Sequence, residues 1–412
     1  MGIDKTRYPD WLIALSITQF SGLLVFMSFA GALPIIQSEW GLSNSQAGII
    51  QSAGQIGYVI AVVFISSLTD YIDPKRMVVG GTLWAGVCNL LLAGLAYDTV
   101  SASILRGLVG FGIAGIYMPG IKLITQKTSG DQRGRSVGIF VGAFTLGAAL
   151  SIALGGNLAS LFGWRLAFSL TSLGPLIGAV VAWRLIPGAL FAPDPTKKNG
   201  SSWNFLQDKR AQIIILIYVC HAWEVLGLRS WLAAYLTTSR LNAGFTLAEA
   251  TSAGATVAGF ATLLAATATA SFGAMSDRFN RRKIIVNVMI AEIVVLLALG
   301  FSMPLPWMLI IIISLLATFL TNADSAVISA RLTELIPEEY LGRTLALYSF
   351  LGFTAGSISP LVFGWALDYF GSNPGQPDSL PWIWAFATLA VGSVAGLFFA
   401  SRLSRQTNPV RA

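Results

Sequence analysis

Long apolar stretches, separated by short polar connectors, run along the whole sequence. The stretches at 284–300 and 308–320 carry one charge between them, that of Glu292, and could not face water. A helix needs roughly 20 apolar residues to cross the hydrocarbon core of a bilayer. The pattern therefore predicts an all-α polytopic membrane protein with twelve spans. The spans are predicted at 11–36, 46–68, 77–97, 101–125, 136–160, 167–187, 211–237, 246–271, 284–302, 306–330, 345–367 and 381–401.

The composition excludes a soluble globular protein. Only 11% of the 412 residues are charged and 55% are hydrophobic, whereas about 25% of the residues in an average soluble domain are charged. The connectors between the predicted spans are too short to form hydrophilic domains. The chain is therefore predicted to have the lipid bilayer itself as a partner.

Basic residues gather on one side of the predicted membrane. Of the 26 lysines and arginines, about twenty lie in the two tails and the even-numbered connectors, and only Arg165 and Arg240 lie in the odd-numbered ones. Basic residues stay cytoplasmic during insertion, so both termini are predicted to be cytoplasmic, in a bacterial cytoplasmic membrane. The net charge of +7 follows this distribution and does not indicate a nucleic-acid partner.

The two halves of the sequence repeat at an offset near 207. Ser66–Asp70 aligns at this offset with Gly273–Asp277, and other small and basic residues align close to it. Six spans in each half give the two copies the same orientation. The repeat predicts two six-helix bundles related by a pseudo-twofold axis and joined by a cytoplasmic linker. The predicted parts are 1–187, 188–210 and 211–412.

The connector after the eighth predicted span carries a specific motif. It reads Gly273-Ala-Met-Ser-Asp277-Arg278-Phe-Asn280-Arg281-Arg282-Lys283. This resembles the helix 2–3 signature of the major facilitator superfamily, G-x-x-x-D-R-x-G-R-R/K. The first copy, around Asp70, keeps less of the signature.

Two further segments carry the same resemblance. Arg106 with Gly110 and Gly115 is similar to the family's helix 4 motif, and Gly163-Trp164-Arg165 is similar to its helix 5–6 turn. The resemblance covers nearly the whole chain and implies the family's fold and a secondary active transporter. It also implies that Asp277, Arg278 and Arg281, and more loosely Asp70, hold the cytoplasmic side closed in one state. Topology determination by basic residues alone is the alternative for this loop.

The fifth span bears on the direction of transport. Family members that export by proton antiport often carry G-x-x-x-G-P-x-x-G-G in this helix. The matching stretch, 147–156, keeps three glycines but has Ser151 and Ile152 in place of the central glycine and proline. The sequence therefore decides neither between symport and antiport nor between uptake and export.

The sequence lacks the motifs that would indicate an enzyme. His221 is the only histidine, so a multi-histidine metal site is excluded. Gly110-Phe-Gly112-Ile-Ala-Gly115 spells G-x-G-x-x-G, but it lies inside a predicted span, where small residues let helices pack closely. We predict no catalytic residue, no metal and no cofactor.

Polar residues at membrane depth are the candidates for function, since burying them is costly without a partner or water. The resemblance implies that spans 1, 4, 7 and 10 line a central cavity. Arginine can bind an anion through two parallel hydrogen bonds, although Arg106 could instead lock helices together or relay protons. The predicted substrate-binding residues are Gln19, Arg106, Tyr117, Arg229, Asn322 and Asp324.

His221 and Glu224 are the candidates for proton coupling. They are three residues apart, so they share one face of the seventh span. A buried carboxyl can exchange a proton with a neighbouring imidazole. A structural pair between Glu224 and either His221 or Arg229 is the alternative. Glu292, on a peripheral span, is expected to pair with a neighbour and is given no functional role.

These features predict a monomeric secondary active transporter that moves a small organic solute by proton-coupled alternating access. The membrane-depth arginines favour an anionic solute. A proton-antiport exporter of hydrophobic drugs or metabolites is an alternative, supported by Trp223, Trp231 and Tyr235 on the seventh span. A membrane sensor or scaffold that binds without transporting is a further alternative.

Overall fold

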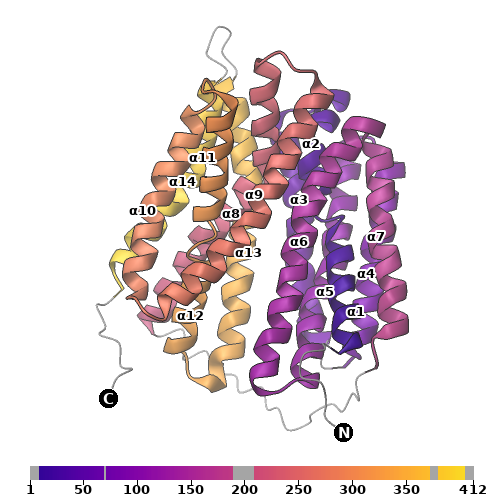
Figure 1. Cartoon of the computed structure of the whole chain (residues 1–412), viewed down its shortest axis with the longest axis vertical. Helices are drawn as coiled ribbons and strands as arrows, with labels where there is room; N and C mark the ends of the chain where they lie inside the picture. The colour runs from indigo at the N-terminus through magenta and orange to yellow at the C-terminus, as the bar shows by residue number, and fades with distance from the viewer. Residues whose placement is uncertain (1–8, 69–70, 189–207, 372–378, 404–412) are drawn as a thin grey trace. The chain divides into compact units, whose positions relative to one another are not determined.

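The computed structural model describes residues 9–68, 71–188, 208–371 and 379–403 (Figure 1). Asp70 and most of the predicted linker 188–210 lie outside the described residues. The regular structure within the described ranges is helical. The helices are α1 (Asp10–Leu23), α2 (Ser28–Trp40), α3 (Asn44–Leu68), α4 (Pro74–Leu95), α5 (Thr99–Lys127), α6 (Gly130–Phe162), α7 (Trp164–Leu185), α8 (Lys209–Asn242), α9 (Leu247–Ser276), α10 (Arg281–Phe301), α11 (Trp307–Leu320), α12 (Ser325–Leu335), α13 (Glu338–Gly371) and α14 (Ser379–Ser401).

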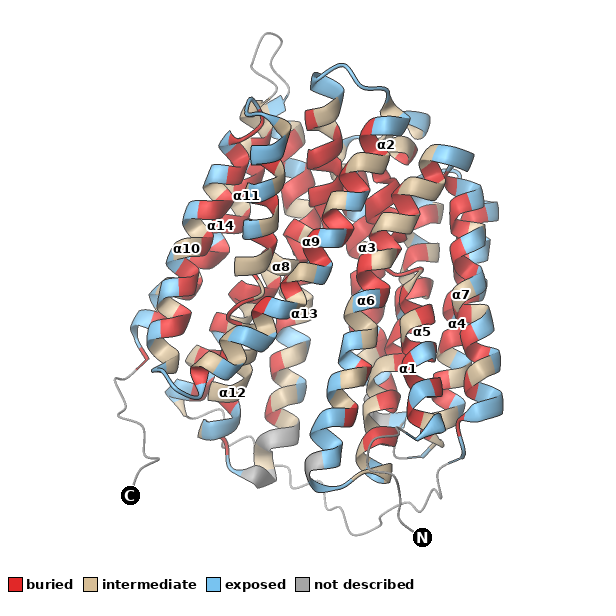
Figure 2. Ribbon diagram, viewed as in Figure 1, coloured by how far each residue is buried: buried red, intermediate tan, exposed pale blue. Residues whose placement is uncertain are grey.

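The helices contain 12 segments that are long and apolar enough to cross a membrane. They follow the twelve predicted spans in order, so the predicted all-α polytopic architecture is confirmed. Large apolar side chains such as Phe64, Val294 and Val391 are exposed on the outward faces of these helices. Figure 2 shows the buried residues on the faces where helices meet one another. This distribution suits a protein whose outer surface contacts lipid.

Two of the predicted spans are broken, which the sequence pattern does not predict. The first, 11–36, is divided into α1 and α2 by residues 24–27, and the tenth, 306–330, is divided into α11 and α12 by residues 321–324. Neither break contains proline or glycine, the usual causes of a kink. Their physical reason is the set of side chains from other helices that bind the freed backbone groups, described below.

The chain divides into two compact units, and each is described by itself. The first unit consists of the described residues that fall within Met1–Gly41, Ala53–Lys197 and Phe245–Gly259. The second consists of those that fall within Leu42–Ser52, Lys198–Gly244 and Phe260–Ala412. The start of α3 thus groups with the second unit and the start of α9 with the first, whereas the sequence repeat assigns each helix to one bundle throughout.

Hydrogen bonds at helix ends explain why these two short segments group as they do. In the second unit, Asp368 on α13 accepts hydrogen bonds from the backbone N–H of Asn44 at 2.9 Å and of Ser45 at 2.7 Å. The side-chain amide of Asn44 donates to the same carboxylate at 2.9 Å. In the first unit, Asn157 on α6 donates to Thr256 at 2.9 Å. A carboxylate at a helix N-terminus is favourable, because the unpaired N–H groups there point toward it.

Glycines in α5 allow close helix packing in the first unit. A methyl group added at Gly112 would lie 2.8 Å from the carbonyl oxygen of Gly81 on α4, and one added at Gly115 would lie 3.0 Å from Gly81 Cα. A methyl group at Gly110 would collide with the carbonyl of Gly54 on α3. The G-x-G-x-x-G run therefore packs helices together, as its place inside a span predicts.

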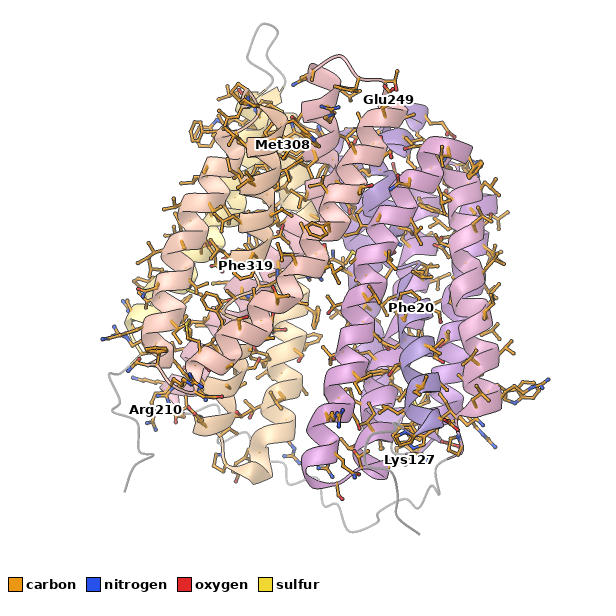
Figure 3. All side chains as sticks on the ribbon, in the orientation of Figure 1. Phe20, Lys127, Arg210, Glu249, Met308 and Phe319 are labelled. Carbon is orange, nitrogen blue, oxygen red and sulfur yellow. The ribbon has the colours of Figure 1, made fainter. Side chains whose placement is uncertain are left out.

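Basic residues lie at the helix ends that the sequence assigns to the cytoplasm. In the second unit, Arg282 at the start of α10 donates to the carbonyls of Ala400 at 3.3 Å and Ser401 at 2.8 Å, at the end of α14. In the first unit, Lys127 at the end of α5 lies 5.9 Å from the ring of Trp11 at the start of α1. Figure 3 labels Lys127 and also Arg210, which lies in the first turn of α8.

Candidate functional site

Arg106 on α5 binds the backbone at the break between α1 and α2. Its Nη1 donates to the carbonyl of Val25 at 3.2 Å and its Nη2 to that of Phe26 at 2.7 Å. The residue is 4% exposed, and the ring of Phe29 lies 5.6 Å from the guanidinium carbon. Among the described residues, only its Nε lacks a partner. Two of the three nitrogens that could bind an anion are thus engaged by backbone carbonyls.

Ser151 on α6 completes the hydrogen bonding of this break. Its hydroxyl donates to the carbonyl of Leu24 at 2.7 Å and accepts from the N–H of Met27 at 3.0 Å. A methyl group at Gly155, one turn further along α6, would collide with the carbonyl of Ser28. The fifth span therefore uses a serine, where the antiporter signature has a glycine, to bind the open turn of the first span.

The other two candidates of the first unit have different surroundings. Gln19 on α1 is fully buried, and neither atom of its amide has a partner among the described residues. Tyr117 on α5 contacts α6, with ring centroids 5.9 Å from Phe140 and 5.5 Å from Phe144. Tyr117 and Arg106 lie eleven residues apart, or about 16 Å along the helix, and they contact different elements.

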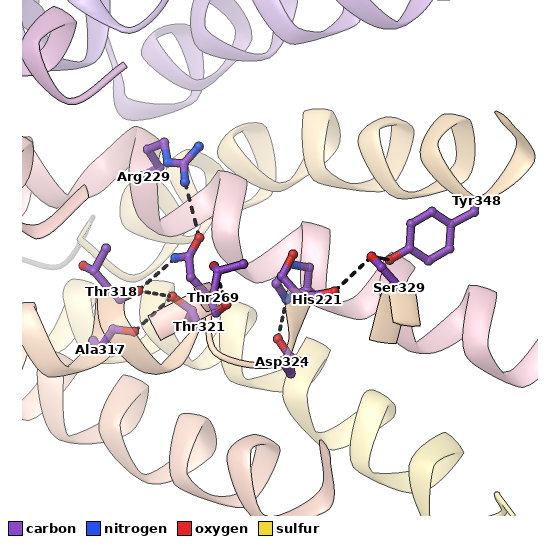
Figure 4. Close-up of polar contacts among 11 residues, drawn as sticks. His221, Arg229, Thr269, Ala317, Thr318, Thr321, Asp324, Ser329 and Tyr348 are labelled. Carbon is purple, nitrogen blue, oxygen red and sulfur yellow. Dashed lines mark hydrogen bonds and ion pairs between the residues drawn. The ribbon is translucent and has the colours of Figure 1, made fainter. Parts of the chain in front are cut away.

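In the second unit, both uncharged and charged side chains contact the residues of the break between α11 and α12 (Figure 4). Thr269 on α9 donates to the carbonyl of Asn322 at 3.0 Å. The Asn322 amide nitrogen donates to the carbonyl of Thr318 at 2.8 Å, and its amide oxygen accepts from Arg229 Nη2 at 3.5 Å. Asn322 and Arg229, both predicted substrate residues, are therefore brought together.

Asp324 lies at the N-cap position of α12 but makes no capping hydrogen bond with its side chain. Its Oδ1 lies 2.7 Å from Nδ1 of His221 on α8, and the Asp324 side chain is fully buried. The nearby N-terminus of α12 favours a negative charge on this carboxyl. The structure thus places His221 against Asp324, whereas the spacing in the sequence paired it with Glu224.

Glu224 contacts a residue to which the sequence assigned no role. Its carboxyl lies within hydrogen-bonding reach of the Glu292 carboxyl on α10 and of the Ser393 hydroxyl on α14. Both glutamates are 1% exposed. Within the described ranges, no group of three His, Cys, Asp or Glu residues is arranged to hold a metal ion. The single charge in the apolar stretch 284–300 was the only signal for Glu292 in the sequence.

Helix α8 presents these groups in different directions. At about 100° per residue, Glu224 lies about 60° around the helix from His221, and Arg229 lies about 140° from Glu224. Arg229 is partly exposed, whereas Glu224 is enclosed. A solute that contacts Arg229 would therefore meet α8 on nearly the opposite side from Glu224.

The predicted gating loop makes one contact that the sequence did not indicate. Arg281 Nη1 lies 2.8 Å from Glu334 on α12, and Arg281 Nη2 lies 3.3 Å from Asp277. The side chain of Asp277 is 72% exposed, and Arg278 is exposed as well. In the described part of the second unit, the loop is therefore tied to α12 through Arg281 and Glu334.

The aromatic residues of α8 are packed inside the second unit. The indole N–H of Trp231 donates to the carbonyl of Pro360 at 2.9 Å, and that of Trp223 donates to the carbonyl of Thr388 at 2.9 Å. The hydroxyl of Tyr235 donates to the carbonyl of Leu299 at 2.8 Å. These side chains bind neighbouring helices, so they no longer support an aromatic cavity for hydrophobic drugs.

Comparison with known proteins identifies the family to which the chain belongs. Residues 15–250 and 243–412 match the family model described as Major Facilitator Superfamily. A probable sulfoacetate transporter of Cupriavidus necator is 25% identical, over 96% of this chain and 94% of its own. The hexuronate transporter of Bacillus subtilis is 24% identical, over 87% of this chain and 88% of its own.

A solved structure shares the fold. The crystal structure of a bacterial homolog to the human lysosomal transporter Spinster, in an inward-facing and occupied conformation, gives a TM-score of 0.79 at 18% sequence identity. The match covers 97% of this chain and 98% of that chain. The fold class predicted from the twelve apolar spans and the repeat is confirmed by this likeness.

Proposed function

Because the chain belongs to the major facilitator superfamily and is a multi-pass membrane transporter of small solutes, we propose that its substrate is a small organic anion moved by proton-coupled alternating access. Family membership and the names of the relatives support transport rather than an enzymatic reaction. Sulfoacetate and hexuronates, named for two relatives, are both small organic anions.

Arg229 carries the proposal of an anionic substrate. It is half-buried at membrane depth, and among the described residues it has the Asn322 amide and no carboxylate as its partner. Its Nε also lacks a hydrogen-bond acceptor there. A guanidinium at this depth is stabilised by a counter-anion, which a carboxylate or sulfonate group of the solute would supply through two parallel hydrogen bonds.

Proton coupling is assigned to the pair formed by His221 and Asp324. Asp324 and Asn322 lie in the same break, residues 321–324. A change in the charge of Asp324 would therefore act on Asn322, which contacts Arg229. Gain or loss of a proton by the pair would change the charge beside the solute by one unit. Proton coupling needs such a link between a titrating group and the substrate contact.

The remaining candidates complete the proposal. Arg106 positions the break between α1 and α2, and Gln19 and Tyr117 contact the solute. Arg281, with Asp277, Arg278 and the undescribed Asp70, closes the cytoplasmic side. The gathering of basic residues supports cytoplasmic termini. In this proposal the protein lies in a bacterial cytoplasmic membrane, where it transports as a monomer.

The test is uptake into proteoliposomes of three radiolabelled probes, namely sulfoacetate, a hexuronate and an uncharged hexose. Arg229→Gln should lower uptake of the preferred anion roughly 30-fold or more, because losing a buried charge partner costs about 2 kcal/mol or more. Arg229→Lys keeps the charge without the planar fork and should give an intermediate rate.

Arg184→Gln, which removes an exposed arginine at the end of α7, is the matched control and should transport normally. Faster uptake of the hexose than of either anion by the wild type would overturn the anionic assignment. Unchanged anion uptake in Arg229→Gln would remove Arg229 from the site.

A further inference from the structure

A second group of buried acids lies on the far side of α8 from Arg229. Glu224 of α8 and Glu292 of α10 are each 1% exposed, and their carboxyls lie within hydrogen-bonding reach of each other. The Ser393 hydroxyl of α14 is a donor within reach of Glu224. A direct hydrogen bond between the two carboxyls requires that one of them carry a proton, because an ionised carboxylate only accepts.

Glycines on α14 enclose this pair. A methyl group added at Gly392 would lie 3.1 Å from Oε1 of Glu224. One turn further along, a methyl group at Gly396 would lie 2.7 Å from the terminal carbon of Met289 on α10 and 3.3 Å from Cβ of Cys220 on α8. The three helices therefore meet closely around the two carboxyls, and a larger residue at Gly392 would crowd Glu224.

Within the described residues, no permanent cation faces the pair. Asp324 lies close enough to act electrostatically on both glutamates. On α8, the other titratable groups nearby are Cys220 and His221, and His221 is already bound to Asp324. From α14 the facing group is the uncharged Ser393. The basic residues of α10 lie in its first turn, about 16 Å along the helix from Glu292.

Two carboxylates in a low-dielectric site without a cation cannot both remain charged. A single proton between them removes one charge and forms a hydrogen bond between the two carboxyls. The same logic makes two acids share one proton in other proteins.

We propose that Glu224 and Glu292 form a second proton-binding site, which holds one proton between the two carboxyls and exchanges it once in each transport cycle. The exchange step rests on the proposed function, whereas the existence of the shared proton does not. The proton joins α8 to α10 while it is bound. Because two charged carboxylates are not stable in the enclosed site, release of the proton requires α8 and α10 to separate so that water reaches the pair, and α8 also carries His221 and Arg229.

The shared proton can be tested by infrared difference spectroscopy of the full-length protein in lipid, between low and high pH. The wild type should show the C=O stretching band of a buried protonated carboxyl. Either Glu292→Gln or Glu224→Gln leaves one buried carboxyl and should shift the frequency of the band, and the variant with both substitutions should remove it. Glu249→Gln, which removes an exposed carboxyl on α9, should keep it. A band that stays at the wild-type frequency in both single variants would overturn the site.

The exchange of the proton is tested by steady-state accumulation of the transported anion at a series of imposed pH gradients in proteoliposomes. Each coupled proton contributes 1.36 kcal/mol per pH unit, a factor of ten in accumulation. Glu292→Gln should therefore lower accumulation roughly tenfold per pH unit, and Glu249→Gln should not.

The two experiments separate the two claims. A shifted infrared band with unchanged accumulation in Glu292→Gln would show a resident proton and overturn the exchange step. If accumulation by the wild type does not depend on the pH gradient, proton coupling as a whole is overturned. The infrared result would still decide whether the pair binds a proton.

Discussion

The two helix breaks, one in each unit, are contacted by side chains of different chemical character. At the break between α1 and α2, the carbonyls of residues 24–26 are bound by Ser151 and by Arg106, a permanent cation. At the break between α11 and α12, the contacts involve Thr269, Asn322 and Asp324, and Asp324 meets the only histidine of the chain.

The two breaks therefore differ in whether the side chains that bind them can exchange a proton. Guanidinium and hydroxyl groups do not change their charge at physiological pH, so binding or release of a proton does not act on the first break. A carboxyl facing an imidazole can gain or lose a proton. We therefore assign positioning to the break of the first unit, and proton coupling to that of the second.

The largest effect on stability is expected from Arg106→Met. The substitution leaves the carbonyls of Val25 and Phe26 buried without their present donor, at about 1–3 kcal/mol each, although Ser28 also donates to Val25 at 3.1 Å. The free energy of unfolding should fall by about 2–4 kcal/mol, measured by chemical unfolding in detergent micelles. Arg106→Lys, which keeps the charge and can reach fewer acceptors, should lose less. Equal stability of Arg106→Met and wild type would show that the break does not depend on this residue.

A smaller decrease in the free energy of unfolding is expected from Ser151→Ala. Leu24 loses a donor and Met27 an acceptor, so the unfolding free energy should fall by about 1–3 kcal/mol. The matched control is Ser160→Ala on the same helix, because Ser160 bonds only to a carbonyl four residues earlier, that of Gly156. The control should change stability by less than about 0.5 kcal/mol. Similar losses in both variants would argue against a special role for Ser151.

The smallest decrease in the free energy of unfolding is expected from Thr269→Val, at the second break. The variant keeps the shape of the side chain and removes one hydrogen bond to Asn322, worth about 0.5–1.5 kcal/mol. Thr267→Val is the control, since the Thr267 hydroxyl is bound locally to Leu264 on an exposed face. A loss larger than that of Ser151→Ala would reverse the ranking of the two breaks.

The apolar pattern predicts the spans well, because span length depends on local hydrophobicity alone. It also predicts that Gly110, Gly112 and Gly115 pack helices, since glycines inside a span have few other uses. The break at 24–27 was not predictable, because Arg106 and Ser151 lie about 80 and 125 residues away in the sequence. Glu292 was missed for a similar reason. Its helix faces both lipid and protein, and sequence spacing does not show that Glu292 meets Glu224.

The central claim is that the titrating pair at the second break, and not the first break, links protons to solute movement. The most direct measurement is steady-state accumulation of the transported anion against the imposed pH gradient, in proteoliposomes with wild type, Asp324→Asn or Ser151→Ala. We predict that Asp324→Asn accumulates roughly tenfold less per pH unit, since one coupled proton is lost, and that Ser151→Ala keeps the wild-type dependence. The same dependence on the pH gradient in Asp324→Asn and wild type would contradict the account.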